Sequence, residues 1–235
     1  MKVGIIFPAY NEEKYIAKVL KKALKIFKKD YIVVVDDGSK DRTYEIAKKY
    51  VKYVIRHERN KGKAEAIKTG IKFLLRKNVN YIIISDADMQ YDVKEAKKIL
   101  KELKKGMQFV MGYRDFSKIP LRHRLGNFVW RTTFNFLFSQ RLRDTNCGLV
   151  GFDREAAKIL VNKIYGGYIL EPSMLIISII YRLRISQVKV NVVYRKISKF
   201  FRGIRVVLGV LIFILRKGLK YRIFKILKKE IKRIL

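Results

Sequence analysis

The sequence predicts an α/β fold in which a mostly parallel central sheet is flanked by helices. Short apolar runs alternate with longer amphipathic segments from residue 2 to about residue 114, which is the pattern of repeated β–α units. The connections between these segments are short, as they are between neighbouring elements of such folds. Acidic residues follow three of the apolar runs, and ligands of open α/β sheets bind just beyond the carboxyl ends of the strands.

The expected strands are short, apolar and rich in β-branched residues, as buried strands are. They cover residues 2–7, 31–35, 51–56, 81–84, 107–112, 149–152 and 186–194. The alternation of apolar and polar residues in the last of these predicts a strand at the edge of the sheet.

The expected helices carry apolar residues at helical spacing. They cover about 12–28, 42–50, 64–75, 93–104, 128–138, 154–161 and 172–183. Asn11 and Asp41 are the expected N-caps of the first two, because a short polar side chain there can accept a hydrogen bond from the first turn. Pro172 stands at an early helix position, where its missing N–H costs little. Glu171, just before it, could orient a ligand, but we do not predict it to be catalytic.

The charge balance is strongly basic, with 54 Lys and Arg against 20 Asp and Glu and a formal net charge of +34. Such a field attracts polyanions, namely nucleic acid, an anionic membrane surface or a phosphorylated substrate. The Lys-rich surface of a thermophile's protein usually carries Glu as well, and acids are scarce here. A polyanionic partner is therefore the preferred interpretation.

Cys147 is the single cysteine, so an intramolecular disulfide is excluded and a reducing compartment fits. We expect it to be a small buried hydrophobe rather than a nucleophile. The first residues, 1–8, have the pattern of a strand and lack that of a signal peptide.

Two aspartates, Asp86 and Asp88, follow the apolar run 81–84. Two close carboxylates repel each other unless a cation lies between them. Hard divalent ions take oxygen ligands and leave room for substrate phosphates, so the sequence predicts a metal ion that binds a nucleotide diphosphate. The alternative is a loop acid followed by a helix N-cap, which is common at strand-to-helix turns.

Two further strand ends carry the same kind of signal, at residues 8–12 and 35–39. On adjacent parallel strands, all three ends would line one crevice. A carboxylate there could accept an N–H from the edge of a base, and an aromatic ring could stack on the base. Asp86 and Asp88 could hold the ion beside it.

These motifs resemble those of the inverting glycosyltransferases of family 2, which have the GT-A fold. The resembling segments are, in order, 7–13, 33–43, 60–64 and 86–90, the last in the form of the family's DxD signature. The resemblance spans about residues 2–200. It therefore implies one GT-A catalytic domain, residues 1–200, followed by basic amphipathic helices in residues 201–235.

The second half of the chain resembles the dolichol-phosphate mannose synthase group of that family. Counterparts of the group's motifs lie at 112–114, 120–127, 144–148 and 195–199. Lys196 stands where the group has a glycine, and the motif at 144–148 also occurs in dolichyl-phosphate glucosyltransferases, so the sugar stays open. The Gln-x-x-Arg-Trp signature of processive polysaccharide synthases is absent from the sequence.

The resemblance implies a role for each residue that matches a family motif. The residues implied to hold the nucleotide-sugar are Pro8, Tyr10, Glu12, Val35, Asp37 and Ala87. Those implied to ligate Mg²⁺ or Mn²⁺ are Asp86, Asp88 and Gln90. The cations implied to meet the diphosphate and the acceptor phosphate are Arg114, Arg124, Arg195 and Lys199. The expected catalytic set is Asp86, Asp88, Arg114 and Arg124. Tyr10 could instead cover the sheet end, and Arg114 could be a solvated strand-end charge.

The reaction implied by the resemblance moves a sugar to dolichyl or polyprenyl phosphate with inversion at the anomeric carbon. GDP-mannose is the preferred donor, and a UDP-sugar carrying glucose or GlcNAc is the alternative. The acceptor is already an anion, since the second pKa of a phosphomonoester is about 6, so it needs positioning by cations more than a general base. Two other classes stay open: a glycosyltransferase with a soluble acceptor, and a basic nucleic-acid-binding α/β protein, for which the sequence has no recognised binding motif.

The tail differs in composition from the rest of the chain. Residues 206–215 carry no charge, but crossing a bilayer requires roughly 20 apolar residues. From residue 218 on, apolar residues share one helical face with Lys and Arg between them, which predicts a helix at a membrane surface. The alternative is packing on the core or on a second subunit. We expect the tail and the aromatic segment 128–138 to hold the protein peripherally at the cytoplasmic face of the cell membrane.

Overall fold

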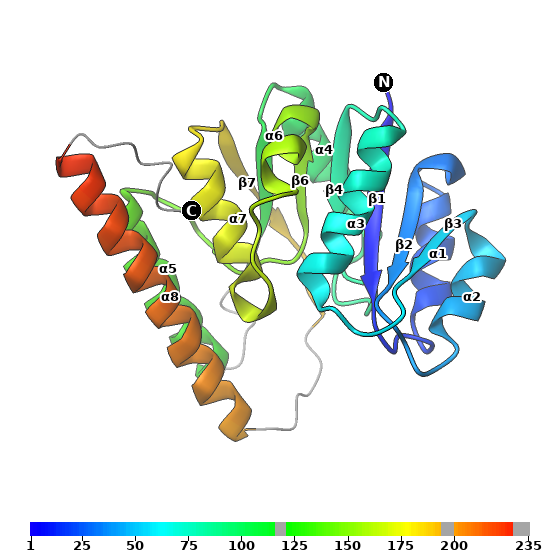
Figure 1. The fold of residues 1–235 in the computed structure, drawn as a ribbon, viewed down its shortest axis with the longest axis horizontal. Helices are drawn as coiled ribbons and strands as arrows, with labels where there is room; N and C mark the ends of the chain where they lie inside the picture. The colour runs from blue at the N-terminus through cyan, green and yellow to red at the C-terminus, as the bar shows by residue number, and fades with distance from the viewer. Residues whose placement is uncertain (116–120, 194–199, 228–235) are drawn as a thin grey trace.

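The computed structural model describes residues 1–115, 121–193 and 200–227, without the side chains of residues 121–123 and 200–205. The seven strands of this part of the chain form one sheet, in the order β3-β2-β1-β4-β6-β5-β7 (Figure 1). The strands are β1 (Val3–Ala9), β2 (Ile32–Asp36), β3 (Tyr53–Arg56), β4 (Tyr81–Ile84), β5 (Phe109–Arg114), β6 (Val150–Asp153) and β7 (Ile185–Val190). The predicted mostly parallel sheet is confirmed, and the last predicted strand does lie at its edge.

The direction of the strands decides which ends meet. β6 pairs antiparallel with β4 and with β5, whereas the pairs β1–β2, β1–β4, β2–β3 and β5–β7 are parallel. The carboxyl ends of β1, β2, β4 and β5 therefore lie at the same edge of the sheet. This is the edge at which an open α/β sheet binds its ligands.

Helices cover both faces of the sheet. They are α1 (Ile16–Leu24), α2 (Thr43–Tyr50), α3 (Lys63–Arg76), α4 (Ala96–Lys104), α5 (Leu121–Phe138), α6 (Arg154–Leu160), α7 (Leu170–Ile180) and α8 (Phe200–Ile226), with the short 3₁₀ helices η1 (Lys29–Tyr31), η2 (Val93–Glu95) and η4 (Gly167–Ile169). α3, α6 and α7 lie in front of the sheet in Figure 1, and α1 and α4 lie behind it. The hydrophobic core fills both layers, with buried residues on every strand except the edge strand β3 and on α1 to α7.

Two glycines allow α3 to approach β1 closely. A Cβ atom on Gly4 would lie 2.5 Å from Leu74 Cδ1, and one on Gly70 would lie 2.6 Å from Ile6 Cγ2. Larger residues at either position would push the helix away from the sheet, because the interior is close-packed. The position of α3 matters for function, since its first residue, Lys63, lies at the ligand-binding edge.

The two predicted N-caps differ from the observed helix starts. α1 begins at Ile16, and Asn11 has a left-handed backbone (φ 56°) and accepts a hydrogen bond from Lys40 N through Oδ1 (2.9 Å). The prediction for Asn11 is therefore wrong, because its amide joins two loops instead. α2 begins at Thr43, whose N–H donates to Asp41 Oδ1 (3.0 Å), so Asp41 serves the first turn from two residues before the helix.

The described part of the tail forms one long helix, α8, which packs parallel along α5 (Figure 1). Trp130 Nε1 donates to Val207 O (3.0 Å), and a Cβ atom on Gly218 would lie 2.6 Å from Leu137 Cβ. Arg222 donates hydrogen bonds to the carbonyl oxygens of Phe136 and Leu137. These belong to the last turn of α5, where carbonyl groups have no N–H partner within the helix. One face of α8 is thus packed on the protein, and the helix runs without a break through residue 218. None of the described helices has the length and apolar content that crossing a membrane requires.

Candidate functional site

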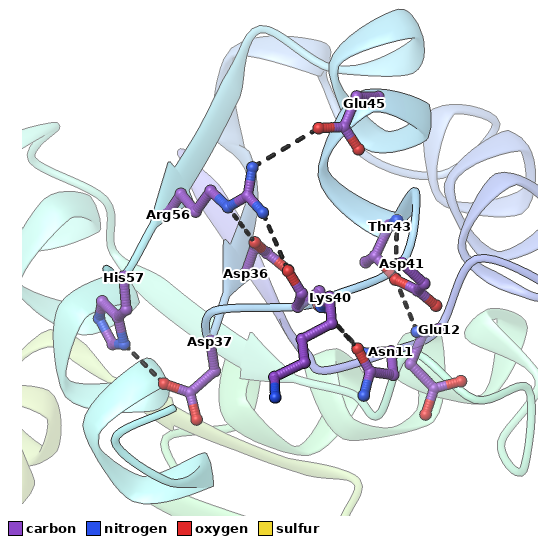
Figure 2. Close-up of polar contacts among 11 residues, drawn as sticks. Asn11, Glu12, Asp36, Asp37, Lys40, Asp41, Thr43, Glu45, Arg56 and His57 are labelled. Atoms are coloured by element: carbon purple, nitrogen blue, oxygen red, sulfur yellow. Dashed lines mark hydrogen bonds and ion pairs between the residues drawn. The ribbon is translucent and has the colours of Figure 1, made fainter. Parts of the chain in front are cut away.

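The three strand ends that were predicted to share a crevice lie side by side. β1 pairs with β2 on one side and with β4 on the other. The loops that follow β1 and β2 are joined by hydrogen bonds, from Asn11 N to Ser39 Oγ (3.0 Å) and from Glu12 N to Thr43 Oγ1 (2.7 Å) (Figure 2). The predicted adjacency of the three strand ends, at residues 8–12, 35–39 and 86–90, is confirmed.

The residues predicted to hold the nucleotide-sugar differ in their exposure. Pro8, Val35 and Ala87 are buried, and Glu12 is half-buried. Tyr10 is 42 % exposed, as a ring that stacks on a base would have to be. The contacts of these residues with a nucleotide stay predictions.

Asp37 is almost fully buried and is bound by three donors. Its carboxylate accepts hydrogen bonds from Lys61 N (2.9 Å) and Gly62 N (2.7 Å), and lies 2.7 Å from His57 Nδ1. His57 Nε2 lies 3.0 Å from Thr69 Oγ1. Asp37 therefore fixes the loop between β3 and α3 to the end of β2 (Figure 2). The sequence did not single out His57, because its ring reaches Asp37 only through the pairing of β2 with β3.

The neighbouring Asp36 is fully buried and meets a different partner. Arg56 Nε lies 3.1 Å from Asp36 Oδ2 in an ion pair that lacks hydrogen-bond geometry. Figure 2 shows Arg56 between Asp36 and Glu45. The same guanidinium donates to Ser39 O (2.9 Å) and lies over the ring of Tyr44, 4.9 Å from its centroid. The two adjacent aspartates thus have separate tasks, since Asp36 meets the end of β3 and Asp37 the loop beyond it.

Asp86 lies at the centre of the site, between a lysine and a glycine. Lys63 Nζ is 2.6 Å from Asp86 Oδ1 and 3.1 Å from Glu171 Oε1. Gly148 closes the other side, because a Cβ atom there would lie 2.4 Å from Asp86 Oδ2. Sequence reasoning gave Glu171 no catalytic role and did not assign one to Lys63. These contacts bring the first turns of α3 and α7 to the end of β4.

Asp88 holds the turn that follows Asp86. Its Oδ1 accepts a hydrogen bond from Gln90 N (2.9 Å). The alternative prediction made the second acid a helix N-cap. The N-cap of the next helix, η2, is instead Asp92, whose side chain accepts a hydrogen bond from Lys94 N. Asp86 and Asp88 therefore stay available as ligands at the end of β4.

The chemistry of these side chains fits a hard divalent ion. Asp86 and Asp88 each use Oδ1 for a protein partner, and within the described ranges Oδ2 of neither accepts a hydrogen bond. In the same part of the chain, no group of three or more His, Cys, Asp or Glu side chains converges on one point. Mg²⁺ and Mn²⁺ accept few carboxylates and complete their coordination with phosphate oxygens and water. Asp86, Asp88 and the Gln90 amide would hold such an ion together with a diphosphate.

Arg114 makes a buried, bidentate ion pair. Its Nε is 2.7 Å from Asp144 Oδ2, its Nη2 is 3.0 Å from Asp144 Oδ1, and Nη2 also donates to Asn127 Oδ1 (3.1 Å). Burial acts to lower the pKa of Arg114, but the Asp144 carboxylate outweighs it and raises that pKa further above its usual value. The alternative of a solvated charge is wrong, because only 13 % of the side chain is exposed. Contact between Arg114 and a diphosphate stays a prediction.

The other predicted cations are placed less fully. Arg124 is the fourth residue of α5 and its side chain is exposed. Arg195 and Lys199 lie outside the described residues. Their predicted contacts with phosphate groups are therefore untested.

Behind Asp86 lies a buried group of weak acids. Tyr91 Oη accepts a hydrogen bond from Gly148 N (3.1 Å), and burial raises the pKa of Tyr91 well above its usual value. Cys147 is fully buried, and burial and the nearby Asp144 raise its pKa to about 12. A thiol with this pKa carries almost no thiolate at neutral pH and is a poor nucleophile. The prediction that Cys147 is a small buried residue is confirmed.

Comparison with known proteins gives one family. Residues 4–160 match the family described as "Glycosyl transferase family 2". The chain is 30 % identical over 235 residues to a UDP-N-acetylglucosamine–dolichyl-phosphate N-acetylglucosaminyltransferase of Methanococcus voltae, covering 90 % of this chain and 93 % of that protein. It is 29 % identical to a dolichyl-phosphate beta-glucosyltransferase of Homo sapiens, covering 80 % of this chain and 66 % of that protein.

Among solved structures, the chain is similar to glucosyl-3-phosphoglycerate synthase from Mycobacterium tuberculosis in complex with Mn²⁺, UDP-glucose and phosphoglyceric acid. The TM-score is 0.75 at 21 % sequence identity, with 92 % of this chain and 79 % of the other covered. At this identity the likeness concerns the fold alone. It confirms the predicted GT-A-like fold.

Proposed function

Because the chain belongs to glycosyltransferase family 2, we propose that it transfers a sugar from a nucleotide-sugar to dolichyl or another polyprenyl phosphate, with inversion and with Mg²⁺ or Mn²⁺. The observation that carries this proposal is the position of Asp86 and Asp88 at the end of β4, beside the two other motif-bearing strand ends. The names of the two relatives, both of which use dolichyl phosphate, support the acceptor. The Mn²⁺ complex of the structural relative supports the ion.

The predicted residues divide between the two parts of the donor. Tyr10, Glu12 and Asp37, with Pro8 and Val35, would hold the nucleoside, and Asp86, Ala87, Asp88 and Gln90 would lie at the diphosphate. A bound divalent ion would neutralise the charge that develops on the leaving diphosphate. Arg114, Arg124, Arg195 and Lys199 supply positive charge for the two phosphate groups. The acceptor phosphate is an anion before it reacts, so no proton has to be removed from it.

The names of the relatives change the donor that we propose to test first. The sequence favoured GDP-mannose, on its likeness to the mannose synthase group. The name of the Methanococcus voltae relative gives a UDP-sugar, and that of the human relative gives glucose. We therefore propose a UDP-sugar as the first donor to test and GDP-mannose as the second.

The outer face of α8 supports a membrane-bound acceptor. Its exposed apolar residues, here called the outer stripe, are Leu208, Ile212, Leu215, Leu219, Ile223, Ile226 and Leu227. At 1.5 Å per residue, the stripe is roughly 28 Å long. Exposed cations of the same helix, Arg216, Lys220 and Lys225, lie between its members in sequence. An apolar stripe flanked by cations is typical of helices that lie in the surface of an anionic membrane.

A charge placed in the outer stripe should weaken membrane binding. We expect Leu219→Asp/Ile223→Asp to lower the affinity for vesicles of mixed anionic and zwitterionic phospholipid by at least about tenfold, because two aliphatic side chains that would enter the membrane surface are lost. The control is Lys18→Ala/Lys25→Ala, which removes one exposed charge from α1 and one from the residue after it, and changes the net charge by the same amount. Vesicle flotation measures both. Equal losses in the two variants would mean that net charge, not the stripe, binds the vesicle.

The transfer itself is tested with the purified protein, Mn²⁺, a polyprenyl phosphate and one of three radiolabelled donors. UDP-GlcNAc, UDP-glucose and GDP-mannose are assayed separately. We expect one of them to give a labelled, chloroform-soluble polyprenyl-phosphate sugar. Transfer to water-soluble acceptors alone would overturn the lipid acceptor. Binding of nucleic acid that fades steeply with salt, without any transfer, would favour the second class of function.

A further inference from the structure

Lys63 connects three elements at the centre of the site. It is the first residue of α3, and its ammonium group bridges Asp86, just beyond β4, and Glu171, in the first turn of α7. Glu171 is separated from Lys63 by 108 residues of chain, so the contact is made only in the folded protein. Lys63 lies within the resembling segment 60–64, but sequence reasoning assigned it no role.

The backbone before Lys63 is held in place by Asp37. Lys61 N and Gly62 N both donate to the Asp37 carboxylate, and Gly62 has a positive φ of 93°, a conformation that favours glycine. On the far side of the bridge, Gly148 fits against Asp86 Oδ2. Lys63 is therefore presented to the two carboxylates by a fixed loop, and not by a mobile surface chain.

The charges explain what the bridge does. Burial acts to lower the pKa of Lys63, but Asp86 and Glu171 outweigh it, so the group stays cationic. Asp86, Asp88 and Glu171 would place three negative charges around the site, and Lys63 compensates one of them. The ammonium group also lies 2.6 Å from Oδ1 of Asp86, a carboxylate that would hold the divalent ion.

A divalent ion that arrives alone therefore meets an unfavourable site. Lys63 repels it, and the described residues offer no cluster of three acidic, His or Cys ligands. A nucleotide diphosphate changes both conditions, because it brings phosphate oxygens as ligands and additional negative charge.

We propose that Lys63 is a positioning residue that makes binding of the divalent ion depend on the nucleotide: it is the counter-cation of Asp86 and Glu171 in the free protein, and the ion joins the site together with the diphosphate. This inference rests on the proposed use of a nucleotide-sugar and a divalent ion. It concerns the order in which the two bind, and not the sugar or the acceptor.

The test measures binding of Mn²⁺ to the full chain by electron paramagnetic resonance, with neither sugar nor lipid present. For the wild type we expect weak binding of Mn²⁺ alone and at least about tenfold tighter binding with UDP or GDP. For Lys63→Met we expect Mn²⁺ alone to bind about tenfold more tightly than to the wild type, because a repelling charge is gone and two carboxylates are left uncompensated. The added effect of the nucleotide should shrink accordingly.

Three further variants make the test specific. Lys61→Met removes an exposed lysine two residues away and should leave Mn²⁺ binding as in the wild type. Lys63→Arg keeps the cation and should also behave as the wild type. Lys63→Met/Glu171→Gln removes one of the uncompensated carboxylates and should return the affinity for Mn²⁺ alone toward the wild-type value.

The outcomes separate this inference from the proposed function. If Mn²⁺ alone binds Lys63→Met no more tightly than the wild type, Lys63 does not have this role, even where sugar transfer is demonstrated. If no donor supports transfer but the Mn²⁺ results are as expected, the role of Lys63 stands and the proposed reaction fails. Circular dichroism establishes that each variant is folded, and Lys63→Gln carries the same test where the Met variant does not fold.

Discussion

Replacing Asp88 by alanine should lower metal-dependent sugar transfer by about a thousandfold, because the ion that neutralises the leaving diphosphate loses one of its two carboxylate ligands. The turn after β4 also loses the acceptor of the Gln90 N–H. We expect the loss in kcat at saturating donor, measured with a polyprenyl phosphate acceptor over a range of Mn²⁺ concentrations. Excess Mn²⁺ should restore only a small part of the activity.

The matched control for Asp88→Ala is Asp30→Ala, which removes an exposed carboxylate from η1, outside the three motif-bearing strand ends. It should keep wild-type transfer and the same dependence on Mn²⁺. Asp88→Asn is a second test, since the amide keeps one oxygen and the acceptor of the Gln90 N–H but loses the charge. Full activity in both Asp88 variants would remove the ion from the mechanism and leave Arg and Lys as the partners of the diphosphate.

The largest expected effect on stability comes from Asp144→Ala. Asp144 is 1 % exposed and Arg114 is 13 % exposed, so removing the carboxylate leaves a guanidinium buried beside Tyr91 and Cys147 without its main counter-charge. Breaking a buried pair in this way typically costs about 3–5 kcal/mol of the free energy of unfolding. We expect a loss in this range from urea denaturation followed by circular dichroism.

A surface pair provides the control for Asp144→Ala. Lys158 and Glu155 lie 2.7 Å apart on α6 and are 51 % and 64 % exposed, so Glu155→Ala should cost less than about 1 kcal/mol. Replacing both members of the buried pair, in Arg114→Met/Asp144→Ala, should recover part of the loss, because no uncompensated charge is left. If Asp144→Ala proves as mild as Glu155→Ala, the pair is not what joins β5 to the loop between α5 and β6.

The order of strands and helices could be predicted because the signals are local. The alternation of β-branched runs with segments of helical spacing predicts the elements. A helix between successive strands, joined to them by short connections, predicts that these strands are parallel. Helix starts were harder to predict, as Asn11 shows. Its side chain accepts a hydrogen bond from Lys40 N in another loop, 29 residues away. Capping preferences describe only the residues next to a helix start, so they do not predict such a contact.

The sequence by itself determined the α/β architecture, the meeting of three motif-bearing strand ends and the basic, amphipathic character of the tail, because each of these follows from residue type and spacing along the chain. Only the tertiary structure decided how the charges pair: Lys63 with Asp86 and Glu171, and Arg114 with Asp144. It also decided that α8 packs one face on α5 and leaves the outer stripe exposed. The physical reason is that ion pairs and helix packing depend on distances in space, and a chain with 54 basic residues offers too many partners for sequence separation to select among them.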